Sequence, residues 1–288
     1  SVVFIFDCYS YDNFLLINVF VNTRDTTCYS IQTQKQEKYM KKLLYFDLEH
    51  GSQTLGSKKD LEKLFGYPEL EPSSFGEFQA VIKQLYAPKK VETTVNIGDL
   101  AIKQSLRKVV PKSKVQIDGI IIDTVSELSK KYQRSLLNQE GMMQMKDWGK
   151  LKNTIDKLMD MLTLLPGILI CNCHSKLQHM DDGASKLVPY IDGSSKEDIS
   201  KWFDFVFYCK AKTNLKGETE YLWRTARTEK YDNAKDRTQL LDADIPQDYQ
   251  LVFDAVKEKG WDGAKILCIG SPGSGKTYSL KTINKEAK

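Results

Sequence analysis

The sequence contains no apolar run long enough to span a bilayer. Its longest candidate, residues 13–21, is about half of the roughly 18 to 20 residues that a transmembrane helix needs. The N-terminus also lacks a basic stretch followed by a small-residue cleavage site, so we expect a cytoplasmic protein. The six cysteines then have no oxidising compartment, and we expect reduced thiols rather than disulfides.

Histidine is scarce as well, with three in the chain. Cys171 and Cys173 lie close to His174 and His179, but their spacing matches no standard zinc pattern. The two cysteines also fall inside an apolar run that resembles a buried strand. The sequence therefore disfavours a metal site built from these residues.

A large excess of either charge is absent too. The chain of 288 residues has 42 Lys and Arg against 38 Asp and Glu, a formal net charge of +4. A hydrophobic fraction of 41% and a charged fraction of 28% are ordinary for a folded protein and exclude disorder throughout. Any nucleic-acid site must therefore be local, because the whole chain presents no strong field.

Residues 1–39 differ in composition from the rest, being rich in Phe, Tyr, Asn, Thr and Ile. Apolar runs at 2–6 and 14–21 flank a polar stretch, which predicts a hairpin. Nothing in this segment belongs to a chemical motif, and Met40 stands directly before a strongly patterned segment. We expect an N-terminal appendage over 1–39 and one domain over 40–288.

From residue 41 onward, short apolar runs alternate with helical patterns, which is typical of an α/β fold with a mostly parallel sheet flanked by helices. The predicted strands are residues 43–46, 119–122, 168–173, 203–209 and 266–269. The run at 203–209 and residues 219–225 are separated by a polar stretch, which predicts an antiparallel hairpin at the sheet edge.

A helix is predicted between the second and third strands. Apolar residues recur from Trp148 to Leu165 at three- and four-residue steps, and Pro166 and Gly167 then end the pattern. Core packing explains such a stripe, so we expect all of it to be buried.

The chain carries a glycine-rich motif near its C-terminus. Residues 270–277 fit the P-loop pattern GxxxxGK[ST] without a mismatch, with a strand pattern before them and a helix pattern after them. Such glycines allow a tight turn whose N–H groups face phosphate oxygens. The motif predicts binding of ATP and Mg²⁺ by Gly270, Ser271, Pro272, Gly273, Ser274, Gly275, Lys276 and Thr277. Lys276 would reach the β- and γ-phosphates, and Thr277 would give its hydroxyl to Mg²⁺.

Two predicted strands end in carboxylates. Asp123 follows three isoleucines, the form of a Walker B site, and would hold Mg²⁺ through its water shell. The strand at 43–46 is followed by Asp47 and Glu49. A carboxylate at a strand end equally caps the next turn or helix. Together with a P-loop, however, these residues predict ATP hydrolysis.

These strand ends, with Cys171-Asn172-Cys173-His174 closing a third strand, resemble the RecA-type recombinase ATPases, a group of P-loop NTPases. The likeness is closest to phage-encoded RecA-like nucleotide-binding proteins that act with single-strand annealing proteins, and it covers about residues 41–288. It implies that Glu49 activates the attacking water and that His174 senses the γ-phosphate, in catalysis with Lys276. It also implies that Lys235 and Arg237 lie near a nucleotide's phosphates, often those of a neighbouring subunit in a homo-oligomer.

The order of the motifs departs from that family, in which the P-loop precedes the Glu strand and the Walker B strand. Here only eleven residues follow Thr277. Joining the end of the chain to Lys41 would restore the family's order, so the sequence indicates a circular permutation. An artefact of gene assembly is the other explanation.

The resemblance implies two mobile loops, and we predict that both contact DNA. Residues 129–152 hold six basic and two acidic side chains, with Tyr132, three methionines and Trp148 as candidates for stacking on bases. Residues 174–198 are rich in Gly, Ser and Asp and predict a flexible segment. The candidate DNA-binding residues are Lys130, Lys131, Arg134, Lys146, Lys176 and Lys186. A solvated helix face is the alternative interpretation of such a charge run.

The motifs predict a Mg²⁺-dependent ATPase, and the resemblance implies that it is stimulated by DNA and binds single-stranded DNA in phage recombination or repair. An annealing protein or a single-strand-binding protein is the expected partner. The alternative is a nucleotide-gated binding or assembly module with little hydrolysis. A small-molecule kinase would need an arginine-bearing lid, and the chain shows no obvious one.

Overall fold

The computed structural model describes residues 41–112, 114–181, 183–193, 195–214 and 216–284, which all lie in one compact unit, Met40–Lys288. The predicted N-terminal appendage and its hairpin lie outside the described residues. Among the described residues, no helix combines the length and the hydrophobicity that a membrane span requires.

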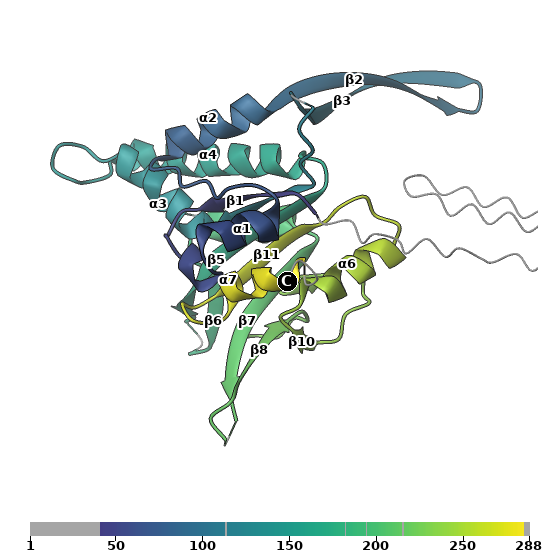
Figure 1. The fold of residues 1–288 in the computed structure, drawn as a ribbon. Helices are drawn as coiled ribbons and strands as arrows, with labels where there is room; N and C mark the ends of the chain where they lie inside the picture. Colours follow the sequence, from purple (N-terminus) through teal and green to yellow (C-terminus); the bar gives the residue numbers. More distant parts are fainter. Residues whose placement is uncertain (1–40, 113, 182, 194, 215, 285–288) are drawn as a thin grey trace, which may run out of the picture. The chain divides into compact units, whose positions relative to one another are not determined.

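A mixed sheet forms the centre of this unit (Figure 1). Its parallel part runs in the order β1 (Leu43–Asp47), β4 (Gly119–Asp123), β5 (Ile168–His179), β11 (Lys265–Gly270) and β7 (Phe205–Thr213). The five strands predicted from apolar runs are therefore confirmed. Their side chains are buried on both faces, which explains why these runs are continuous rather than alternating.

The sheet continues beyond β7 with antiparallel strands. β8 (Thr219–Arg224) pairs with β7 as predicted, but β10 (Asp244–Pro246) pairs with β8 on its other side. The predicted hairpin is therefore one strand away from the edge. β9 (Lys235–Asp236) pairs with the beginning of β7.

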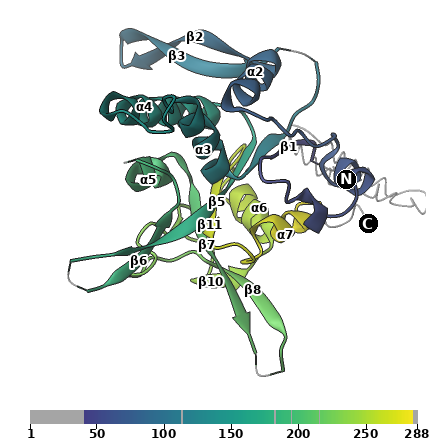
Figure 2. The ribbon, with the colours of Figure 1, turned by 90° about the vertical axis from the view of Figure 1, so that its left-hand side faces the viewer.

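Helices cover both faces of the sheet (Figures 1 and 2). On one face, α2 (Phe75–Leu85), α3 (Val125–Ser135) and α4 (Met145–Thr163) pack in a core with Ile120 and Ile122. On the other, α1 (Lys58–Phe65) and α6 (Tyr249–Glu258) pack in a core with Ile121. This alternation along β4 follows from the two-residue period of a strand. The remaining helical elements are η1 (Ser52–Thr54), α5 (Ser195–Asp198), η2 (Ile199–Trp202), α7 (Lys276–Ser279) and η3 (Leu280–Thr282).

The helix predicted between β4 and β5 is α4, and its stripe is buried from Leu151 onward. The expectation that the whole stripe is core is wrong for Trp148, which is 40% exposed. Trp148 lies in the first turn of α4, which extends past the buried cluster.

Two predictions about irregular segments need correction. The segment 174–198 is not a continuous loop, because β5 extends to His179 and pairs with β6 (Ser185–Pro189). Its polar composition concealed the pairing, which closes through a turn at Gly183 with φ +83°. A further hairpin, β2 (Tyr86–Ile97) and β3 (Leu100–Pro111), was not predicted.

The last described residues meet the first ones. The Asn284 side chain accepts a hydrogen bond from Lys41 N (3.2 Å) and donates to the carbonyl oxygens of Lys41 (3.0 Å) and Leu64 (2.8 Å). The two ends of the domain are therefore held together by the polar groups of one side chain.

We expect Asn284→Ala to lower the free energy of unfolding by about 1–3 kcal/mol, because it leaves partly buried backbone groups without partners. Urea denaturation followed by circular dichroism would measure the change. Lys259→Ala, at an exposed position, is the control and should shift stability by under about 0.5 kcal/mol. Equal effects of the two substitutions would contradict this prediction.

Candidate functional site

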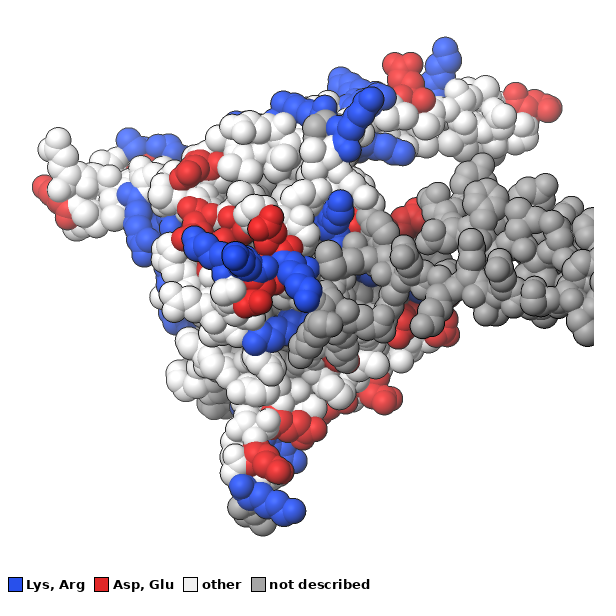
Figure 3. Space-filling model, in the orientation of Figure 1, with Lys and Arg blue, Asp and Glu red and all other residues white. Residues whose placement is uncertain are grey.

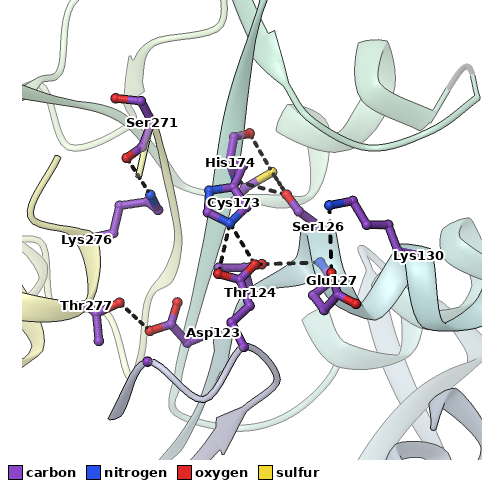
Figure 4. A network of polar contacts seen from close by, with 12 residues as sticks. Asp123, Thr124, Ser126, Glu127, Lys130, Cys173, His174, Ser271, Lys276 and Thr277 are labelled. Carbon is purple, nitrogen blue, oxygen red and sulfur yellow. Dashed lines mark hydrogen bonds and ion pairs between the residues drawn. The ribbon is translucent and has the colours of Figure 1, made fainter. Parts of the chain in front are cut away.

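The candidate site lies where four parallel strands end. Asp47 on β1 lies opposite Asp123 on β4, and Gly270 on β11 lies opposite His174 on β5. Because parallel strands in register end at one edge, side chains from distant parts of the chain gather there (Figure 4). This edge of a parallel sheet is where ligands generally bind.

The glycine loop, residues 270–277, follows β11 at this edge. Gly275 has φ +91°, and a Cβ atom there would lie 2.5 Å from Gln247 Oε1. A Cβ atom at Gly270 would lie 2.3 Å from Ser274 Oγ. The loop is therefore packed too closely to accept a larger residue at these two positions.

Lys276 is buried at the base of the glycine loop. Its ammonium group donates to the carbonyl oxygens of Gly270 (2.8 Å) and Ser271 (2.9 Å), so it lies against the loop's own backbone (Figure 4). The loop is also tied to the rest of the domain, because Gln247 Nε2 donates to Ser274 O at 2.9 Å. The ammonium group of Lys276 is thus held inside the tight turn of the glycine loop.

Asp123 and Thr277 bring the glycine loop and β4 together. The Thr277 hydroxyl donates to Asp123 Oδ2 at 2.7 Å across 154 residues of sequence (Figure 4). Tyr45 also donates to that oxygen, at 3.3 Å. Burial raises the pKa of Asp123, and the hydrogen bond from Thr277 partly offsets this. The two neighbouring oxygen groups are of the kind that Mg²⁺ prefers.

Glu49 lies beside the same strand ends. His174 Nε2 is 2.6 Å and 2.9 Å from its two carboxylate oxygens, and the Thr124 hydroxyl donates to Oε1 at 2.6 Å. Partial burial favours the neutral form, but the hydrogen bonds from His174 and Thr124 outweigh it and lower the pKa of Glu49. The structure therefore holds an ionised carboxylate at the edge, next to Asp123 and the glycine loop.

Asp47 shapes the turn that presents Glu49. Its carboxylate accepts backbone N–H groups from Glu49 (3.1 Å), Gly51 (3.1 Å) and Ser52 (2.8 Å). Sequence reasoning placed Asp47 at a strand end without giving it a role. The signal was an Asp at the end of a strand, followed four residues later by Gly51, since an Asp side chain in a turn commonly accepts a hydrogen bond from the backbone two residues on.

Ser126 fixes the strand end that carries His174, and sequence reasoning missed it. Its hydroxyl accepts from His174 N at 2.9 Å and lies 3.3 Å from Cys173 Sγ (Figure 4). Ser126 lies in the first turn of α3, so the helix that follows Asp123 also sets the position of the neighbouring strand. No local pattern signals a contact between residues that are 48 positions apart.

Comparison with protein families matches residues 33–238 to the AAA domain family. This match covers more than half of the chain. The chain belongs to the AAA domain family. This is a P-loop NTPase-type family, so the AAA domain is expected to bind nucleotide. The match ends before the glycine loop. No curated protein matches the chain, and no solved structure does.

A pocket of about 450 Å³ adjoins the glycine loop of the AAA domain. Residues 271–274 form one wall, and residues 209–212 of β7 with Leu222 of β8 form another, while Tyr231 adds an aromatic ring. The loop therefore has open space beside it rather than packed side chains.

The structure places Lys235 and Arg237 away from the glycine loop. β9 pairs with the first residues of β7, the opposite end from the one where β11 leads into the loop. Lys235 donates to Ser200 O at 2.7 Å, and Arg237 pairs with Asp204 at 3.0 Å. Burial and the nearby Arg237 lower the pKa of Lys235 to about 8. Within one chain, Lys235 and Arg237 therefore do not lie with Glu49, Asp123 and the glycine loop.

The residues predicted to bind DNA do not form one free basic surface. Lys130 and Arg134 both pair with Glu127, at 3.7 Å and 2.7 Å, and Lys186 pairs with Asp232 at 3.0 Å. The others are Lys131, which donates to Ser73 O, Lys176, which lies over the Tyr190 ring, and Lys146, which is exposed. Carboxylates therefore already compensate half of this predicted set.

We expect Asp47→Ala to lower the free energy of unfolding by about 2–4 kcal/mol, because three backbone N–H groups are left without a charged acceptor. The matched control is Asp60→Ala, which removes a carboxylate that caps the exposed start of α1 and should cost about 1 kcal/mol. Urea denaturation would compare the two. Equal losses of stability would show that the Asp47 turn is no more important than an ordinary helix cap.

Proposed function

We propose that this AAA domain is a RecA-like ATPase whose glycine loop is a P-loop for ATP. The observation that carries the proposal is the hydrogen bond between Thr277 and Asp123, which puts the hydroxyl of the loop beside the carboxylate that ends an apolar strand. A hydroxyl and a carboxylate in these two positions are the groups that hold a phosphate-bound metal in P-loop NTPases.

Mg²⁺ fits the residues present. Thr277 would give one ligand and Asp123 would act through metal-bound water, since Mg²⁺ usually keeps several waters and takes few protein ligands. Among the described residues, no cluster of three His, Cys, Asp or Glu forms a closed metal cage. When bound, the ion would neutralise charge on the phosphate oxygens. Thr277 would then exchange its hydrogen bond to Asp123 for that role.

Lys276 is suited to bind the phosphates. Its ammonium group now satisfies two backbone carbonyls inside the loop, at 2.8 Å and 2.9 Å. A phosphate oxygen is a stronger acceptor than a neutral carbonyl, because the hydrogen bond is then charge-assisted on both sides. The side chain would therefore turn from the loop's backbone toward the β- and γ-phosphates.

Glu49 is the residue we assign to activate the attacking water, and His174 is the group that responds to the γ-phosphate. The lowered pKa of Glu49 keeps its carboxylate ionised and able to accept a proton. Both of its oxygens lie within hydrogen-bond distance of His174 Nε2, so a water that approaches the carboxylate competes with His174 for them. Because the contact with His174 occupies the carboxylate that would activate water, it also favours the second candidate function, a nucleotide-gated assembly module with slow hydrolysis.

We further propose that the motif order is a circular permutation. β11 lies between β5 and β7 in the sheet although it comes last in the sequence, and Asn284 hydrogen-bonds to Lys41. Termini that meet are the condition under which a chain can be reopened elsewhere without changing the fold. The family match ends at residue 238, before the segment that would have moved.

The proposal extends to single-stranded DNA as the regulating ligand, in phage recombination or repair, with an annealing or single-strand-binding protein as partner. Resemblance to phage RecA-like proteins supports it. In a homo-oligomer, Lys235 and Arg237 would serve the nucleotide of the neighbouring subunit, which agrees with their distance from the glycine loop of their own chain.

Two substitutions test the ATPase proposal. Lys276→Ala should weaken ATP binding by roughly 10- to 150-fold, the value of about 1.5–3 kcal/mol for hydrogen bonds to a charged group. Glu49→Gln should retain ATP affinity within about threefold and lower turnover by about 10²–10⁴-fold. Calorimetry and phosphate release measure these quantities, with and without single-stranded DNA. Glu62→Gln, on the exposed side of α1, is the control. Unchanged ATP binding in Lys276→Ala would refute the proposal, whereas unchanged turnover in Glu49→Gln would favour the assembly module.

A rearranged chain tests the permutation. It would run from residue 243 to 284, then through a short Gly-Ser linker to residues 41–242. We expect the same circular dichroism spectrum, cooperative unfolding and an ATP affinity within a few-fold of the original, since every described strand keeps its neighbours. Loss of cooperative unfolding would count against the permuted order. The same chain with Lys276→Ala controls for ATP binding outside the loop.

A further inference from the structure

The β2–β3 hairpin, here called the arm, is a sheet of its own (Figures 1 and 2). Only its base is packed: Tyr86 and Val109 are buried in the core beneath α2 and α3. Toward the turn its large apolar side chains are between 40% and 64% exposed, namely Val95, Ile97, Leu100, Ile102 and Leu106. A two-stranded ribbon with no covered face has little stability of its own.

The two faces of the arm differ in chemistry. The cross-strand pairs Val91–Leu106, Val95–Ile102 and Ile97–Leu100 fall on one face, because alternate residues of a strand share a side. The other face carries polar pairs such as Thr94–Lys103 and Glu92–Ser105. The arm therefore presents an aliphatic surface on one face and a polar surface on the opposite face.

Four cations oppose one another across the arm. Lys89 pairs with Lys108 and Lys90 pairs with Arg107 in consecutive cross-strand positions. Because successive residues alternate between faces, Lys89 and Lys108 share the face of the aliphatic pairs, whereas Lys90 and Arg107 lie on the polar face. Like charges directly opposite in a sheet are destabilising. None of the four forms an ion pair with another described residue. This cationic quartet contrasts with the cations near α3, which pair with Glu127. Figure 3 shows basic side chains gathered over β2 and β3.

Anions lying against this arrangement would relieve the repulsion between the opposed cations, and a chain of phosphates supplies several at once. In a duplex the bases are stacked and covered, so it offers phosphates but little apolar surface. An unpaired strand offers both phosphates and exposed base faces, which aliphatic and aromatic side chains can cover. The arm has both kinds of surface, so its charge and its aliphatic face together match an unpaired strand.

We propose that the arm binds single-stranded nucleic acid, with the cationic quartet on phosphates and the aliphatic face of β2 and β3 against bases. This rests on the proposed function for the identity of the regulating ligand, and it moves the expected contact from residues 129–152 and 174–198 to residues 86–111. Lys103 extends the phosphate contact toward the turn, where Ile97 and Leu100 provide the apolar end.

The test is fluorescence anisotropy of a labelled single-stranded DNA with the full chain, without nucleotide, over a range of salt. Changing the quartet to glutamine (K89Q, K90Q, R107Q, K108Q) should lower affinity at least tenfold at low salt. The slope of log affinity against log salt should fall by about 0.7 for each phosphate that the variant no longer neutralises. The charge-matched control is K59Q, K63Q, K257Q and K259Q, at exposed positions elsewhere, and it should keep the slope.

A second variant separates the apolar contribution. Ile97→Ser with Leu100→Ser should lower affinity several-fold at an unchanged salt slope, because no cation is removed. The quartet variant relieves like-charge repulsion, so its melting temperature should not fall, and weaker binding then cannot be due to unfolding. Lys276→Ala should retain DNA binding in the absence of nucleotide, which keeps this test independent of the ATPase proposal.

Three outcomes would overturn the assignment. The first is a quartet variant that binds DNA as tightly as the original chain. The second is a duplex of the same sequence that binds as tightly as the single strand. The third is an Ile97 and Leu100 variant that dissociates an oligomer, by analytical ultracentrifugation, with DNA binding unchanged, since the aliphatic face would then contact a second copy.

Discussion

The buried carboxylate of Asp123 is the group on which the site depends. A charge in that position is costly unless donors face it, and the hydroxyls of Thr277 and Tyr45 are the donors that the chain supplies, at 2.7 Å and 3.3 Å. Thr277 can reach Asp123 only if the glycine loop leaves the sheet at the edge where β4 ends. The contact between Thr277 and Asp123 therefore depends on the position of β11 in the sheet and on the geometry of the loop.

The contact between Thr277 and Asp123 requires that β4 and β11 end at the same edge of the sheet, but it does not require any particular order of these strands along the chain. β11 is held by hydrogen bonds to β5 and β7, and its neighbours are the same wherever the chain begins. The polar groups of Asn284 join the end of the domain to Lys41, at the start of β1. The strand that ends in Asp47 and the helical segment that follows the glycine loop are thus contiguous in the fold, although most of the sequence separates them.

What the sequence predicted well was local. The apolar run before Asp123 forms β4 and the run before residues 270–277 forms β11, as predicted, because the pattern of each strand is contained within a few residues. The contact of the Ser126 hydroxyl with His174 was not predictable, because it forms only once segments 48 positions apart meet. The turn around Asp47 is local, with donors at Glu49, Gly51 and Ser52, but a carboxylate at a strand end has several possible roles and its pattern does not single out this one. The arm was missed for another reason. Its alternating pattern carries lysines and threonines, and alternation without a buried face resembles a polar loop.

The distribution of compensated charge links the arm to the rest of the domain. Near α3, Lys130 and Arg134 share one carboxylate, that of Glu127, so a phosphate there would compete with Glu127 for both cations. In the arm, opposed cations repel each other, and an incoming anion relieves that repulsion. The base of the arm packs in the same core as Ile122 and Val125, which flank Asp123 and Thr124. A nucleic-acid strand bound to the arm would therefore influence Glu49 through this packed core, by favouring one arrangement of the core side chains over another.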